Sequence, residues 1–118
     1  VAFMLKKILL LLICTTVITV SAISLMRYLL VNEVENHLIE EGFDKDHFDT
    51  SYYRNISLKG NDSKQVKVIF TSQPDYHFYF YKNDDATIEL RTIKDLTTNT
   101  RLGTAEEMAP YISKIQEK

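Results

Sequence analysis

The feature that most limits what this chain can form is a run of 19 uncharged, mostly apolar residues, Ile8 to Met26. As a helix rising ~1.5 Å per residue, the run would be roughly 28 Å long, close to the ~30 Å hydrocarbon core of a bilayer. A core helix of a soluble protein would need a strongly polar face. Apart from Cys14, the polar residues here are hydroxyls that can bond to their own helix: Thr15, Thr16, Thr19, Ser21 and Ser24. We predict a membrane-spanning helix.

The charges on either side of this run predict its orientation. Lys6 and Lys7 precede it, whereas Arg27 alone follows it before a series of acidic residues. Basic residues stay on the cytoplasmic side of a membrane helix. We therefore expect residues 1–27 to form a cytoplasmic stub and a signal-anchor helix, and residues 28–118 to form a small extracytoplasmic domain. The predicted location is the cell membrane, crossed once.

Signal-peptide cleavage is the alternative to anchoring. Val20-Ser21-Ala22 offers residues that a signal peptidase accepts. Cleavage after Ala22 would release a small secreted protein that acts as a soluble inhibitor or effector. Against cleavage, the apolar run is long for a leader, and apolar residues resume at Ile23 and again between Tyr28 and Val31. We favour an uncleaved anchor and keep the secreted protein as the alternative.

The outer part of the chain is acidic and carries no cysteine. Residues 28–118 contain 11 basic and 16 acidic residues, a net charge of −5. Nucleic acid binding needs a basic surface, so no nucleic acid partner is expected. Cys14 is the only cysteine, so the outer part can form no internal disulfide and no thiolate metal site.

We expect the membrane helix to continue into the outer part. No Gly or Pro interrupts the chain between Met26 and Gly42, and apolar residues recur with helical spacing at Leu30, Val31, Val34, Leu38 and Ile39. The helix should end near Glu41. There Gly42 can adopt the left-handed conformation of a C-terminal cap, and Phe43 can fold back onto the last turn.

The chain then changes to the two-residue alternation and β-rich composition of strands. Four strands are expected, at Ser51 to Leu58, Gln65 to Thr71, Tyr76 to Tyr81 and Thr87 to Ile93. The short, turn-rich segments between them are typical of an antiparallel meander. The predicted fold class is α+β. A long N-terminal transmembrane and stalk helix packs its membrane-distal part on a small β-meander of about four strands.

The C-terminal segment gives a mixed signal. Thr104 and Glu107 can form a capping box, but Pro110 falls where it would break the helix that follows. We expect at most two short turns, or a helix that begins near Pro110.

The aromatic run Tyr76 to Tyr81 is the most unusual local feature. Strand register decides which of its rings face the core. We prefer Phe78 and Phe80 inward, together with Ile88 and Leu90, because tyrosine tolerates partial exposure through its hydroxyl. This choice leaves a possible interaction face made of His77, Tyr79 and Tyr81. The alternative is that these rings are the ordinary aromatics of a half-buried strand.

No catalytic or metal-binding motif can be assembled from the sequence. His37, His47 and His77 lack the i, i+4 spacing of a zinc pair. Neither a G-x-S-x-G elbow nor a phosphate-binding loop can be built around the three glycines. A membrane-tethered hydrolase would need separated groups such as Asp44 and His47, and their spacing does not favour it. We expect no enzyme activity, no catalytic residue, no cofactor and no bound metal.

Several of these features occur in a characteristic order. Lys6-Lys7 precede the apolar run, and then come Val34-Glu35-x-x-Leu38, Glu41-Gly42-Phe43, Val66-x-Val68-x-Phe70, Gln73-Pro74 and Tyr79-x-Tyr81. From about Lys6 to Tyr81 the chain resembles an uncharacterised family of short, N-terminally membrane-anchored Firmicute proteins, known only as a domain of unknown function. The resemblance implies a Gram-positive cell surface and supplies no activity. We therefore expect a membrane-anchored interaction module whose partners are the lipid bilayer and a protein at the outer membrane face.

Overall fold

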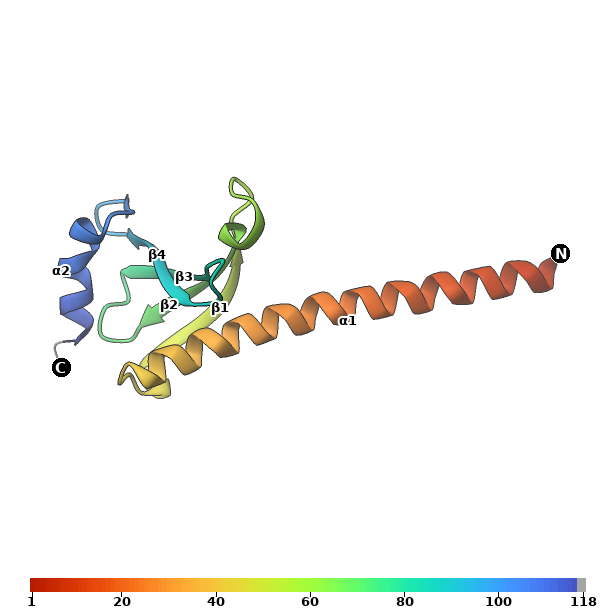
Figure 1. Cartoon of the computed structure of the whole chain (residues 1–118), viewed down its shortest axis with the longest axis horizontal. Coiled ribbons are helices and arrows are strands. Elements are labelled where there is room, and N and C mark those ends of the chain that lie inside the picture. Colours follow the sequence, from red (N-terminus) through yellow and green to blue (C-terminus); the bar gives the residue numbers. More distant parts are fainter. Residues whose placement is uncertain (117–118) are drawn as a thin grey trace.

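The computed structural model describes residues 1–116 and consists of a long helix with a small α+β unit packed against its C-terminal end (Figure 1). The molecule extends 68 Å along its longest axis and 29 Å across the other two. This elongated shape arises because the N-terminal part of the helix projects away from the folded unit. The N-terminus and the sheet therefore lie at opposite ends of the molecule.

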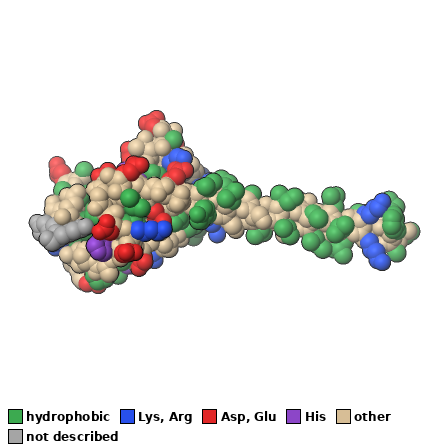
Figure 2. Space-filling model, turned by 90° about the horizontal axis from the view of Figure 1, so that it is seen from below, with side chains coloured by type: hydrophobic (Ala, Val, Ile, Leu, Met, Phe, Trp, Pro, Cys, Tyr) green, Lys and Arg blue, Asp and Glu red, His purple; other side chains and the backbone are tan. Residues whose placement is uncertain are grey.

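Helix α1, Ala2–Glu40, runs for 39 residues without interruption, as predicted. Among residues 1–116 it is the one helix that is long and apolar enough to cross a membrane, and its most apolar stretch is not buried by the rest of the chain. Figure 2 shows apolar side chains along this projecting segment and basic side chains near its free end. By length and composition, α1 can be a membrane anchor or a signal sequence.

The polar side chains inside the apolar segment are partly satisfied within the helix. The hydroxyls of Thr15, Thr16 and Thr19 each donate a hydrogen bond of 2.9 Å to the carbonyl four residues earlier. Such bonds remove the need for a water partner, and unsatisfied donors are costly in hydrocarbon. The three threonines are therefore compatible with a lipid environment.

The C-terminal end of α1 is closed by the predicted glycine cap. Gly42 has a φ of +103°, its N–H donates to the Ile39 carbonyl, and the Phe43 N–H donates to the Leu38 carbonyl, both at 3.0 Å. This is the hydrogen-bond pattern of a Schellman motif. The Phe43 ring then packs against Phe70, with 4.9 Å between ring centroids, so the cap directs the chain back onto the sheet.

Five strands form one antiparallel sheet in the order β1-β2-β3-β4-β5, which confirms the predicted meander and adds one strand. Their bounds are β1 Phe48–Arg54, β2 Lys64–Phe70, β3 Tyr76–Lys82, β4 Ile88–Asp95 and β5 Thr100–Leu102. Short 3-10 turns, η1 at Lys45–His47 and η2 at Gly60–Ser63, precede β1 and β2.

Strand β1 lies three to four residues earlier than the predicted Ser51 to Leu58. Asn55 ends it, because the Asn55 Oδ1 atom accepts hydrogen bonds from both the N–H and the hydroxyl of Ser57. This side-chain turn competes with strand extension. Ile56, whose apolar side chain suggested a longer strand, is 91 % exposed.

Strand β5 was outside the four predicted strands. It has only three residues, of which Thr100 and Arg101 are polar, so no alternation marks it. The turn before it carries the signal instead. Asp95 Oδ1 accepts from the N–H and the hydroxyl of Thr97 at 2.9 and 2.6 Å, and Asn99 adopts a φ of +54°. This turn returns the chain alongside β4.

The hydrophobic core lies between one face of the sheet and the C-terminal part of α1. Phe78 and Phe80 point into this core, and Ile88 and Leu90 pack partly buried beside them, as predicted. From α1, Val34 and Leu38 are buried, and Leu30 and Val31 are partly buried. Ile39 is 45 % exposed, so the predicted width of the apolar stripe is wrong at that residue.

The C-terminal segment forms helix α2, Ala105–Gln116, which is longer than predicted and starts before Pro110. Thr104 caps it, because the Thr104 hydroxyl oxygen accepts from the Glu107 N–H at 3.2 Å. A proline inside a helix costs about 3 kcal/mol. Burial of Met108 and Ile115 in the core contributes roughly 1.5 to 3 kcal/mol each, which offsets that cost. Tertiary packing therefore overrides the local signal.

Candidate functional site: the open face of the sheet

Both helices cover the same face of the sheet, and the opposite face, here called the open face, carries the predicted site residues. Side chains alternate along a strand, so His77, Tyr79 and Tyr81 of β3 point away from Phe78 and Phe80. Their neighbours come from all the other strands. The open face consists of Asp49, Ser51, Tyr53, Gln65, Lys67, Ile69, His77, Tyr79, Tyr81, Glu89, Arg91, Thr92, Lys94 and Arg101.

Tyr79 lies at the centre of the open face but is only 5 % exposed, so its predicted exposure is wrong. The Tyr53 ring lies 5.0 Å away at an interplanar angle of 56°. The guanidinium of Arg101, on β5, lies 5.1 Å from the Tyr79 ring centroid. Burial raises the pKa of the Tyr79 hydroxyl above its ordinary value, with Arg101 opposing that shift. Tyr79 is therefore buried beneath the side chains of Tyr53 and Arg101 and is not itself available to a partner.

Tyr81 is the more accessible tyrosine of the pair. Its hydroxyl donates to Glu89 Oε2 at 3.2 Å, and the Arg91 guanidinium lies 5.4 Å from its ring centroid. The contact between Arg91 and Tyr81 is made possible by a bulge opposite Tyr79 and Phe80. The bulge inserts one extra residue, Arg91, into β4. Desolvation, followed by the bond to Glu89, raises the pKa of the Tyr81 hydroxyl.

His77 lies at the other end of β3, partly buried. It is the direct partner of Ile69 on β2 and of Lys94 on β4. Burial lowers the pKa of the imidazole below its ordinary value, and the positive charges of Lys67 and Lys94 lower it further. These effects favour the neutral form of the His77 imidazole, which lies near the ammonium groups of Lys67 and Lys94.

The open face is basic although the outer part of the chain is acidic. Four cationic side chains, Lys67, Arg91, Lys94 and Arg101, share it with two carboxylates, Asp49 and Glu89. Arg91 is partly neutralised by the carboxylate of Asp62, 4.0 Å away. Within residues 1–116, Lys67, Lys94 and Arg101 form no salt bridge. An acidic partner is thus complementary to this face.

Sequence reasoning identified the three β3 residues but missed the arginines that frame them. Arg91 reaches Tyr81 only because of the bulge, and Arg101 belongs to the short strand β5. Neither the bulge nor β5 has a periodic signature in the sequence. The signal in the sequence that could have indicated β5 is the pair Asp95 and Thr97, whose side chains form the turn before this strand.

The remaining candidate groups are scattered over the surface. His37 lies 3.8 Å from Glu41, and His47 lies 3.8 Å from Asp44. The Asp44 and His47 side chains are 73 % and 57 % exposed, which is not a water-excluding environment of the kind that strengthens acid–base chemistry. In the part of the chain that the structure describes, no group of three or more histidine, cysteine or acidic residues is placed to hold a metal ion.

No family model, no curated protein and no solved structure matches this chain. The resemblance to an uncharacterised Firmicute family stays a prediction.

Proposed function

We propose that the protein is a single-pass membrane protein, with its N-terminus in the cytoplasm, whose outer domain is an interaction module on the surface of a Gram-positive cell. The observation that carries this proposal is the division of α1. The same uninterrupted helix has an apolar segment that the rest of the chain does not bury and a final segment, from Leu30 onward, that is part of the domain core. A partner bound to the domain would therefore be held at a set height above the bilayer.

The continuity of α1 also supports an uncleaved anchor over a secreted protein. Cleavage after Ala22 would leave a product that begins in mid-helix, with Ile23, Leu25 and Met26 between 46 % and 59 % exposed to water. In a bilayer these residues instead contact lipid, which is the favourable environment for apolar side chains. The two lysines near the N-terminus and the single Arg27 after the span support the N-in orientation.

The partner that best fits the open face is an acidic protein segment. Lys67, Lys94 and Arg101, which form no salt bridge within residues 1–116, supply positive charge, and Tyr81 supplies an accessible aromatic ring. Tyrosine and arginine are the residue types that most often dominate binding energy at interfaces. The resemblance described above, which supplies no activity, is compatible with a binding role.

Localisation is tested by expressing the chain with a C-terminal tag in a Gram-positive host and fractionating the cells. The proposal expects full-length mass in the membrane fraction and a tag that external protease removes. A tagged product that begins at Ile23 in the medium would instead establish the secreted alternative.

Partner binding is tested by cross-linking on intact cells followed by purification through the tag. Lys67→Gln with Lys94→Gln should reduce the cross-linked partner at least about fivefold, because electrostatic complementarity steers association. The matched control, Lys45→Gln with Lys59→Gln, removes the same charge elsewhere and should have little effect. Tyr81→Ser is the suitable aromatic test, since Tyr79→Ser would also open a buried site. Equal losses in both double variants would refute recognition by the open face.

A further inference from the structure

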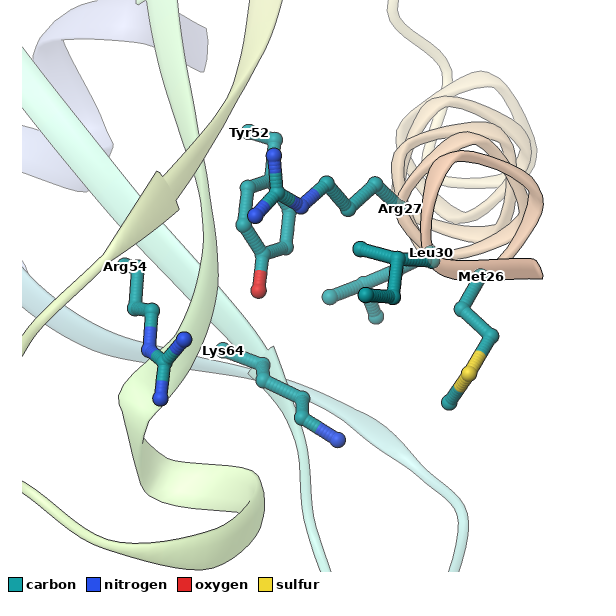
Figure 3. A pocket seen from close by; sticks show the side chains of 7 residues that line it. Met26, Arg27, Leu30, Tyr52, Arg54 and Lys64 are labelled. Carbon is teal, nitrogen blue, oxygen red and sulfur yellow. The ribbon is translucent and has the colours of Figure 1, made fainter. Parts of the chain in front are cut away.

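A hollow lies where α1 leaves the proposed membrane and meets the edge of the sheet. It has a volume of about 240 Å³. The lining residues labelled in Figure 3 come from α1 (Met26, Arg27 and Leu30), from β1 (Tyr52 and Arg54) and from β2 (Lys64). Ile23 completes the lining. The cavity thus has an apolar helix wall and a cationic rim.

Within the described residues, the three cations of this cavity, Arg27, Arg54 and Lys64, have no anionic partner. Arg54 and Lys64 are direct partners across β1 and β2, and like charges placed opposite one another destabilise a sheet. The Arg27 guanidinium lies 5.0 Å from the Tyr52 ring centroid, on the same side. Among residues 1–116, none of the three forms a salt bridge and no carboxylate lines the cavity. A bound anion would relieve this repulsion.

The height of the cavity along α1 indicates where that anion comes from. If Ile8 to Met26 cross the ~30 Å hydrocarbon core, the headgroup layer beyond it is roughly 5 to 7 Å thick. Arg27 and Leu30 are three residues apart, which is about 4.5 Å along a helix, so both fall within that layer. Ile23 and Met26 fall in the last turn of the hydrocarbon. The cationic rim therefore lies at the level of lipid phosphates.

Neighbouring residues support contact of this end of the domain with the membrane. Ile56, in the loop that follows Arg54, is 91 % exposed. Glu33, the closest acid along α1 in an adjoining hollow, is held by Lys82 at 3.0 Å. Because the Glu33 carboxylate is paired with Lys82, Glu33 does not neutralise Lys64.

We infer that this cavity binds the headgroup phosphate of an anionic phospholipid from the outer leaflet, with the acyl chains lying along Ile23 and Met26. The inference rests on the proposed membrane anchoring. A zwitterionic headgroup fits less well, because its ammonium group would meet Arg27, Arg54 and Lys64 without a carboxylate partner. The lipid would also brace the domain against the bilayer surface.

The test uses the full-length chain reconstituted into vesicles of phosphatidylcholine mixed with an equimolar amount of phosphatidylglycerol. Flotation first establishes that the chain resides in the membrane. Spin-labelled phosphatidylglycerol and spin-labelled phosphatidylcholine then report, through the immobilised fraction of each, the relative affinity of the protein for the two lipids. We expect about a tenfold preference for phosphatidylglycerol, because each basic residue near an anionic surface contributes substantially to binding.

Two triple variants distinguish binding in the cavity from a general effect of the positive charge of the protein. Arg27→Gln, Arg54→Gln and Lys64→Gln combined should reduce the preference to about twofold or less. The matched triple variant Lys45→Gln, Lys67→Gln and Lys94→Gln lowers the net charge equally and should keep it. Arg54→Lys retains the charge and should keep it as well, and tyrosine circular dichroism establishes that each variant is folded.

Each other outcome overturns the inference in a recognisable way. A chain that floats but shows no lipid preference, or loses it equally in both triple variants, refutes the cavity and leaves the anchor intact. Displacement by inorganic phosphate, compared with chloride at equal ionic strength, would identify a free anion as the ligand instead. A chain that does not float refutes the anchoring on which the inference rests.

Discussion

The two parts of helix α1 share one backbone and differ in what surrounds their side chains. From Ile8 to Met26 the helix is apolar on nearly every side and exposed, as at Leu11, which is 68 % exposed. From Leu30 to Glu40 it is amphipathic, with Val34 and Leu38 buried against the sheet. Helical hydrogen bonding is therefore common to both parts. The periodicity of the side chains, and not the presence of a helix, distinguishes the uniformly apolar part from the part that packs in the domain core.

This difference predicts that the domain depends on only one part of its longest element. The most apolar stretch of α1 is not buried by the rest of the chain, whereas residues near Val34 form part of the domain core. Substitutions in the two parts should thus have unequal effects on the free energy of unfolding of the domain.

The largest effect is expected from truncating a leucine in the packed part. Leu38→Ala should lower the free energy of unfolding of the domain by about 2 to 5 kcal/mol, because it leaves a cavity in the core. Leu11→Ala makes the same chemical change in the projecting part and should alter it by less than about 0.5 kcal/mol. Urea denaturation in detergent micelles, followed by tyrosine circular dichroism, measures both. Similar losses in the two variants would show that the projecting part also packs in the domain.

The helix cap provides the next largest effect. Gly42→Ala should destabilise the domain by about 1 to 2 kcal/mol, because a side chain disfavours positive φ. Apart from the adjacent residues of the chain, no described atom lies within 4 Å of the position a Cβ would take, so the cost is conformational. Gly103→Ala is the control, since Gly103 has equal space and no positive φ. Thermal unfolding of the two variants compares them, and a larger loss in Gly103→Ala would contradict the role of the cap.

Polar contacts between α1 and the sheet should contribute less. Glu35 Oε1 accepts a hydrogen bond from the partly buried Thr50 hydroxyl, so Glu35→Ala should lower the free energy of unfolding by about 1 kcal/mol. Glu33 pairs with Lys82 on the surface, so Glu33→Ala should lower it by less than about 0.5 kcal/mol. Urea denaturation at low and high salt distinguishes them. A larger loss in the free energy of unfolding for Glu33→Ala than for Glu35→Ala would contradict this order.

Acid sensitivity should arise in the domain, at Asp95. Hydrogen bonds from the Thr97 side chain, and then from the Tyr111 hydroxyl, hold the pKa of Asp95 below its usual range. As the pH falls below the ordinary carboxyl pKa of about 3.9, the unfolded chain therefore binds a proton before the folded chain does. The stability contributed by Asp95 is complete above that pH and declines as the pH approaches the folded-state pKa.

Asp95→Asn checks this expectation. The difference in free energy of unfolding between the original chain and Asp95→Asn should be constant above about pH 5 and should shrink below about pH 4. Denaturation series at several pH values measure it. A difference that grows on acidification would contradict the lowered pKa.

The fold was largely readable from the sequence wherever periodicity carries the signal. The uninterrupted helix, the Gly42 cap, the meander and the inward direction of Phe78 and Phe80 were predicted from spacing and turn residues. The errors fall where a local side chain or a distant contact decides. Asn55 ends the strand before Ile56, whose apolar side chain had favoured a longer strand, and core packing stabilises a helix that contains Pro110.

The candidate site was less predictable than the fold. Alternation alone placed His77, Tyr79 and Tyr81 on one face. It could not show that Tyr53 and Arg101 cover Tyr79, since these residues come from strands far apart in the sequence. The meeting of Arg54 and Lys64 with Arg27 likewise depends on strand register and on how the helix crosses the sheet.

The single cysteine of the chain, Cys14, lies in the projecting part of α1 and offers the most direct test of the account. Vesicles carrying the tagged protein are treated with a membrane-impermeant maleimide, before and after denaturation in detergent, and the label is quantified by mass. The account predicts no labelling in intact vesicles and one label per chain after denaturation, because Cys14 is retained and lies in the bilayer. Labelling in intact vesicles would place Cys14 in water, and a tagged product with no thiol after denaturation would mean that the segment had been removed.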